Sequence, residues 1–229
     1  EGGTTNYSLA DTLIDSRIGR RRTSDATVTQ YSGIRPGFLV GQQFDQNNVA
    51  LKDRKGNPLA FDPNIAANMI ETGSNLELTG IRVAKYFPDF SDPGGKYYSS
   101  TPGNWLMLFR YPDVVLMVAE AKMRAASADD AGALALVNDL RAHRGAAAMA
   151  SMTLVNAGSV DGPGDTNTLL AERGRELYWE SVRRTDLIRF GVFNVLWQYK
   201  PADDPKYLVF PVPNQALAVN PNLKQNPGY

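Results

Sequence analysis

A run of helical periodicity after residue 110 constrains the fold of this chain more than any other feature. Tyr111-Pro112-Asp113 is typical of a helix start, because proline is tolerated in the first turn and an acidic side chain is favoured at the positive end of the helix dipole. Apolar residues then recur at spacings of three and four. They predict one broad apolar face, formed by Val114, Val115, Val118, Ala119 and Met123.

A second helix is predicted directly after a short polar break. Asp129 or Asp130 can cap its start, and Gly145 is a plausible stop. Its apolar stripe comprises Ala133, Leu136, Val137 and Leu140. Two helices joined by so short a turn pack antiparallel, so we expect an αα-hairpin like those of tetratricopeptide-like solenoids. Only one clear pair is evident, and we therefore expect neighbouring repeats to lie outside this chain.

A third helical region is expected to begin at Asn167 or Thr168 and to reach Gly191 in one or two pieces. Opposite charges recur in it at spacings of three and four, as in Glu172–Arg175, Glu176–Arg173 and Glu180–Arg184. Glycoside hydrolysis uses paired carboxylates, and Glu176 and Glu180 lie one turn apart. Because every glutamate here has an arginine within reach, we interpret the region as an ion-pair lattice and reject a hydrolase.

The remaining segments are less regular, and two regions are predicted: a loop-rich part over 1–103 and a helical part over 104–229. Short strands are expected at 38–40 and 81–84, and a hairpin over 49–61 with its turn over 52–58, where Gly56-Asn57-Pro58 suits such a turn. Near the end, residues 207–213 are predicted to form a strand that runs into an extended proline-containing stretch. The predicted fold class is thus mainly α, with a loop-rich segment containing short β-hairpins.

Composition excludes several classes of function. The 24 Lys and Arg residues balance 24 Asp and Glu residues, whereas nucleic-acid binding requires a basic excess on one face. The chain contains no cysteine, which excludes disulfides and thiolate metal sites, and its single histidine, His143, cannot form a multi-histidine site. No apolar run approaches the roughly 20 residues that a membrane span needs. We therefore predict no nucleic-acid partner, no metal, no cofactor and no catalytic residue.

An aromatic-rich segment is the best candidate for a ligand site. It contains Tyr86, Phe87, Phe90, Tyr97 and Tyr98, with Trp105 shortly after, and polar side chains among them. Aromatic rings pack on the C–H faces of sugars while polar groups bind hydroxyls, which is how a small-ligand site is usually formed. The predicted glycan-binding residues are Phe90, Asp92, Lys96, Tyr97, Tyr98 and Trp105. The alternative is that Tyr86, Phe87 and Trp105 close a core.

Several short motifs, taken in order, resemble a known family. They are RYPDVVLMVAEA at 110–121, ALVNDLR at 135–141, ERGREL at 172–177, DLIRFG at 186–191, FPVP at 210–213 and NPNLKQNPGY at 220–229. In this order they resemble the C-terminal region of the SusD/RagB family of outer-membrane nutrient-binding lipoproteins. The chain departs from the family at Gly174, within its arginine-rich run, and at 181–185, where Ser181-Val182-Arg183-Arg184-Thr185 replaces a Gly-His-aromatic stretch.

The resemblance implies a non-catalytic protein that binds oligosaccharides at the bacterial surface and covers a SusC-like TonB-dependent transporter. Family members are anchored in the outer membrane through a lipidated N-terminal cysteine and carry further tetratricopeptide-like helix pairs. Neither is found in this chain, so we expect it to correspond to the C-terminal part of such a protein. The alternative function is a protein–protein interaction scaffold without a sugar site of its own.

Overall fold

The computed structural model describes residues 37–44, 49–62, 78–85, 107–156, 167–196 and 200–229. The chain divides into two compact units, Glu1–Ala150 and Ser151–Tyr229. Helices predominate in the described part and the strands form only short pairs, which confirms the mainly α fold class. The predicted boundary between the loop-rich part and the helical part, at residues 103–104, lies outside the described residues and stays a prediction.

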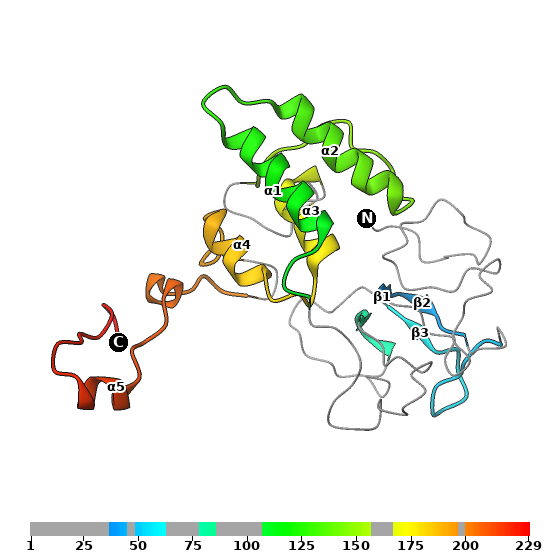
Figure 1. The fold of residues 1–229 in the computed structure, drawn as a ribbon. Helices are drawn as coiled ribbons and strands as arrows, with labels where there is room; N and C mark the ends of the chain where they lie inside the picture. Colours follow the sequence, from blue (N-terminus) through cyan, green and yellow to red (C-terminus); the bar gives the residue numbers. More distant parts are fainter. Residues whose placement is uncertain (1–36, 45–48, 63–77, 86–106, 157–166, 197–199) are drawn as a thin grey trace, which may run out of the picture. The chain divides into compact units, whose positions relative to one another are not determined.

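The predicted αα-hairpin is present in the first unit. Helix α1 spans Tyr111–Arg124 and helix α2 spans Asp130–His143, and the two pack against each other (Figure 1). The Asp129 side chain accepts a hydrogen bond of 2.8 Å from the Gly132 N–H, as expected of an N-cap. At the other end Gly145 adopts a φ of 71°, and its N–H donates to the carbonyl of Ala142. The sequence thus located both ends of α2.

The buried stripe of α1 differs from the predicted one. Leu116 and Ala119 are fully buried, whereas Val114 and Val118 remain nearly half exposed. The middle of this helix is apolar almost all round, so periodicity alone does not select the face that α2 covers. In α2 the expected residues Ala133 and Val137 are buried.

Two polar side chains, one partly buried and one fully buried, bind the loop that follows α2. The Asn138 amide accepts from the Met149 N–H at 2.8 Å and donates to the Met149 carbonyl at 3.0 Å. The guanidinium of Arg141, only 1% exposed, donates to the Ala147 carbonyl at 2.7 Å. These bonds provide partners for backbone groups of the loop, which would otherwise lack a partner away from water.

The short strands form two antiparallel pairs. Strand β1 (Gly37–Leu39) pairs with β4 (Arg82–Ala84), and β2 (Gly41–Gln42) pairs with β3 (Ala60–Phe61). The strands predicted at 38–40 and 81–84 are confirmed to within one residue as β1 and β4, whose pairing with each other was not predicted, and β2 was not predicted either.

The turn that precedes β3 follows the predicted hairpin. The Asp53 carboxylate accepts from the N–H groups of Lys55 and Asn57, both at 2.8 Å, while Gly56 adopts a φ of 87°. An Asx side chain that binds backbone amides ahead of it stabilises a tight turn, and glycine supplies the left-handed residue.

The third helical region forms in two pieces in the second unit. Helix α3 spans Leu169–Leu177 and helix α4 spans Arg183–Arg189, and Thr168 caps α3 by accepting from the Ala171 N–H at 3.0 Å. In the part of the chain that the structure describes, no helix is both long enough and apolar enough to cross a bilayer.

The strand predicted after residue 206 is wrong. Residues Pro205–Leu208 form the 3-10 helix η4, and the side chain of its N-cap residue Asp204 accepts a hydrogen bond from the Lys206 N–H. An aspartate followed by proline favours such a start over a strand. Helix α5, Asn214–Val219, was not predicted.

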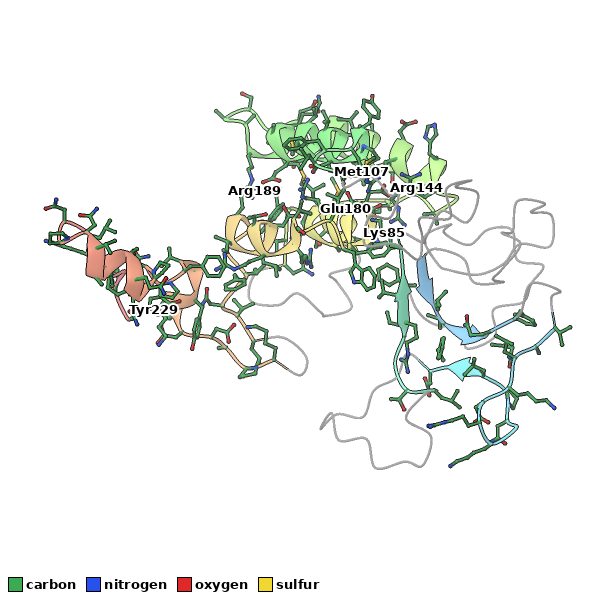
Figure 2. All side chains as sticks on the ribbon, turned by 60° about the horizontal axis from the view of Figure 1, so that its bottom comes forward. Lys85, Met107, Arg144, Glu180, Arg189 and Tyr229 are labelled. Atoms are coloured by element: carbon green, nitrogen blue, oxygen red, sulfur yellow. The ribbon has the colours of Figure 1, made fainter. Side chains whose placement is uncertain are left out.

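Side chains from the end of the chain hold the extended stretch between η4 and α5. The Gln225 amide binds both the N–H and the carbonyl of Val212, at 2.7 and 2.9 Å. The Tyr229 hydroxyl donates to the Val209 carbonyl at 2.9 Å (Figure 2). These side chains satisfy the backbone groups that a neighbouring strand would otherwise pair.

Candidate functional site

The predicted aromatic site lies outside the described residues. All six of its candidates fall within 86–106: Phe90, Asp92, Lys96, Tyr97, Tyr98 and Trp105. Their role therefore stays a prediction. The described residues hold a different candidate, at the turn between α3 and α4, where Figure 2 labels Glu180.

This turn has an unusual backbone. Trp179 and Ser181 adopt φ values of 59° and 63°, in the left-handed region that favours glycine. A bulky side chain there is a genuine outlier, and such strain is maintained only when the surrounding structure fixes it. The left-handed conformation of Ser181 fits the family resemblance, because Ser181 begins the stretch that replaces the Gly-His-aromatic stretch of the family, and glycine adopts this conformation without strain. The Trp179 side chain is 63% exposed.

An open pocket of about 430 Å³ lies beside this turn. Its lining combines an apolar side chain, an indole ring, a hydroxyl and two guanidinium groups, from Leu177, Trp179, Ser181, Arg183 and Arg184. The volume falls within the range of about 300–1,000 Å³ that small-molecule sites occupy. All five residues belong to the second unit.

Arg183 is fixed against helix α3. Its Nη1 donates to the Leu170 carbonyl at 2.8 Å, and its guanidinium lies beside Gly174. Burial lowers the pKa of Arg183, the nearby Asp186 carboxylate opposes this effect, and the cation of Arg173 adds to it. An arginine keeps its charge in proteins even when partly buried, so this side of the pocket carries a cation.

Arg184 contacts two aromatic rings and a backbone carbonyl. Its Cζ lies 4.9 Å from the ring centre of Phe193 and 4.4 Å from that of Phe210. Its Nη2 donates to the Tyr207 carbonyl at 2.6 Å. Two rings and a carbonyl in contact with it restrict the orientation of this guanidinium.

The acidic side chains of α3 and α4 pair with other arginines. Asp186 accepts from Arg173 Nε at 2.8 Å, with 2% and 1% of these side chains exposed, and from Arg189 at 2.8 Å. The predicted Glu172–Arg175 pair is confirmed at 2.7 Å.

The predicted Glu180–Arg184 pair is wrong, because among the described residues neither Arg183 nor Arg184 forms an ion pair. Arg184 turns instead towards Phe193, Phe210 and the carbonyl of Tyr207.

The glutamates of α3 do not form an accessible carboxylate pair. Glu172 and Glu176 are 0% and 4% exposed. A glycosidase needs two carboxyl groups that flank a substrate bond, and these two cannot reach one. Within the described ranges, no group of three acidic or histidine side chains gathers in a way that could hold a metal ion.

The sequence pattern does not reveal the pocket beside Trp179, because periodicity does not show that the helix ends at Leu177. The available signal was Ser181, which begins the stretch that replaces a glycine-containing one in the family and thereby indicates a left-handed turn.

Comparison with known proteins gives the family. The model described as the SusD family matches residues 62–203. The starch-binding protein SusD of Bacteroides thetaiotaomicron is 28% identical to the chain over 159 residues, which make up 66% of this chain and 26% of that protein. The chain thus spans about a quarter of the length of this curated relative. Because the family match covers more than half of its residues, the chain belongs to the SusD family.

Proposed function

We propose that this protein binds oligosaccharides at the bacterial cell surface without catalysis and delivers them to a SusC-like TonB-dependent transporter of the outer membrane. The observation that carries the proposal is membership of the SusD family, together with similarity to a protein named for starch binding. An outer-membrane location with a lipid anchor belongs to the same proposal.

The non-catalytic part of the proposal is supported by the charges of the second unit. The glutamates of α3 are buried, and Glu172 is bound by Arg175. A buried, paired carboxylate serves neither as a general acid nor as a nucleophile towards a glycosidic bond. Binding would instead rely on ring stacking and hydroxyl hydrogen bonds.

We place the main sugar site in the aromatic segment of the sequence. Tyr97 and Tyr98 would stack on pyranose rings, with Phe90 and Trp105 beside them and Asp92 and Lys96 as hydroxyl partners. This assignment rests on the density of aromatic and polar residues in the sequence.

Native affinity electrophoresis tests the proposal. The full 229-residue chain is run through gels that contain different soluble polysaccharides, beside the Tyr97→Ala/Tyr98→Ala variant. We expect one glycan to retard the wild type and not the double variant. Tyr111→Ala is the matched control, because this tyrosine is 80% exposed on α1 and belongs to no proposed sugar site. Absence of retardation by every glycan would contradict sugar binding by this chain.

A second candidate function, a protein-binding scaffold, is favoured by one surface. Apolar side chains are exposed on and just before α1, among them Leu108, Phe109, Tyr111, Val114 and Val118. Exposed apolar surface of this kind is typical of interaction sites. Val114→Asp/Val118→Asp separates the two functions, because it should abolish capture of a protein partner and leave retardation by a glycan unchanged.

A further inference from the structure

We propose that the pocket beside Trp179 is a separate saccharide subsite that takes a sugar bearing a carboxylate. The proposal deepens the sugar-binding function and rests on it. It concerns residues distinct from the aromatic segment, so the two sites can be tested independently.

The exposed ring of Trp179 supplies the stacking surface. It is 63% exposed and lines the pocket, so part of the ring is accessible to a ligand. Trp179 adopts a left-handed backbone, which costs free energy in a bulky residue and persists only because the surrounding structure fixes it. An aromatic ring fixed in this way stacks on a sugar without losing much conformational freedom.

The two arginines supply the charge selectivity. Arg183 and Arg184 line the same pocket, and among the described residues neither is in an ion pair. The bonds of each to backbone carbonyls leave further N–H groups of the guanidinium, which has five donors. A planar guanidinium matches the geometry of a carboxylate, so a uronic acid would be preferred to a neutral sugar.

The positions of the arginines are fixed before a ligand arrives. Phe193 and Phe210 lie against the Arg184 guanidinium, and the Leu170 carbonyl and Gly174 fix that of Arg183. Preorganised donors lower the entropic cost of binding. Ser181 lines the pocket as well, and its hydroxyl is a further partner for a sugar.

The test compares an acidic probe with its own uncharged methyl ester. Oligogalacturonate, oligomannuronate and hyaluronan oligosaccharides are titrated into the full chain by calorimetry, beside the methyl ester of whichever acidic probe binds. We expect at least one acidic probe to bind, with esterification weakening its affinity by about tenfold or more because the charge-assisted hydrogen bonds are lost. Equal affinity for acid and ester would overturn the carboxylate preference, and no binding by any acidic probe would overturn the subsite.

Trp179→Gly places the binding in this pocket. Glycine accepts the left-handed backbone, so this variant removes the ring without adding strain. We expect it to lose about tenfold or more in affinity for the acidic probe. Phe109→Ala, which removes an exposed ring from another unit, should bind like the wild type. Unchanged affinity in Trp179→Gly would overturn the subsite.

Failure of this subsite is distinguishable from failure of sugar binding as a whole. Retardation by a neutral polysaccharide that depends on Tyr97 and Tyr98 and persists in Trp179→Gly, without any acidic binding, would support the proposed function and overturn the subsite. Acidic binding that depends on Trp179 and persists in Tyr97→Ala/Tyr98→Ala would establish the subsite on its own.

Discussion

The guanidinium of Arg183 occupies the space that a side chain at position 174 would fill. A Cβ atom added to Gly174 would lie 3.0 Å from Nη1 and 3.3 Å from Cζ of Arg183. Glycine inside a helix costs about 1 kcal/mol relative to alanine. Here the absence of a side chain at Gly174 leaves room for the Arg183 guanidinium of α4 directly against α3. Nη1 of Arg183 also donates to the Leu170 carbonyl.

A double-mutant cycle measures this relationship. Gly174→Ala alone should gain helix propensity and lose the fit to Arg183, and we expect the unfolding free energy to change by less than about 1 kcal/mol. In an Arg183→Ala background the same substitution should stabilise by about 1 kcal/mol, because only propensity remains. Urea unfolding of the four proteins gives the coupling energy. Equal effects of Gly174→Ala in both backgrounds would refute the close contact.

The buried Arg173–Asp186 pair should be costly to break from one side. Asp186→Asn leaves Arg173 as a buried cation without its carboxylate, and we expect a loss of about 3–5 kcal/mol in unfolding free energy. Chemical denaturation monitored by circular dichroism measures it. Arg189→Gln is the control: this partner of Asp186 is 42% exposed, so its loss should cost less than about 1 kcal/mol.

An apolar replacement of the pair tests the cause of that loss. Arg173→Met/Asp186→Leu removes both charges together, and we expect it to be more stable than Asp186→Asn alone. A double variant as unstable as Asp186→Asn would show that packing, rather than the uncompensated charge, sets the cost.

The cap of α2 should make a small, pH-dependent contribution. Hydrogen bonds from Lys122 and from the Gly132 N–H lower the pKa of Asp129 below its ordinary value of 3.8. A carboxyl with a lower pKa in the folded state stabilises the fold above its unfolded pKa and loses that contribution as pH falls through the folded pKa. The stability difference between the wild type and Asp129→Asn should therefore shrink below pH 3.8.

The same prediction can be checked on the carboxyl group itself. NMR titration should show the pKa of Asp129 rising in Lys122→Met, because the largest cause of its shift is removed. An unchanged pKa would assign the effect to the helix backbone alone.

The Asn138 amide should stabilise the loop after α2. Asn138→Ala leaves the N–H and carbonyl of Met149, a residue only 5% exposed, without their side-chain partner. We expect a loss of about 1–3 kcal/mol in unfolding free energy, measured by urea denaturation. Asn222→Ala, at an exposed position, should change it by less than about 0.5 kcal/mol. A similar small effect at Asn138 would mean that solvent replaces both bonds.

Local chemistry explains which elements could be predicted. The ends of α2 follow from Asp129 and Gly145, and the turn before β3 follows from Asp53 and Gly56, because each residue acts on backbone groups a few positions away. The interior of a helix is less informative when it is apolar all round, as at Val114 and Val118. There the neighbouring helix selects the buried face.

The glycan site could be predicted only as a cluster of residue types, since stacking requires rings and hydroxyls require polar partners. By contrast, the pocket beside Trp179 combines residues of the α3–α4 turn with a guanidinium that Phe193 and Phe210 hold from further along the chain. A pattern with a helical period does not reveal contacts across such distances in sequence.

The sequence by itself determined the family, the helical hairpin and the charged helices, because these depend on periodicity, caps and the order of short motifs. Only the tertiary structure decided that Arg173 pairs with Asp186 on another helix, that Gly174 accommodates Arg183, and that β1 pairs with β4. The physical reason is the sequence separation of the groups that interact. Capping and turn formation act over a few residues. Burial, by contrast, removes water from polar groups that are distant in sequence, and such groups then need hydrogen-bond partners from other elements of the fold.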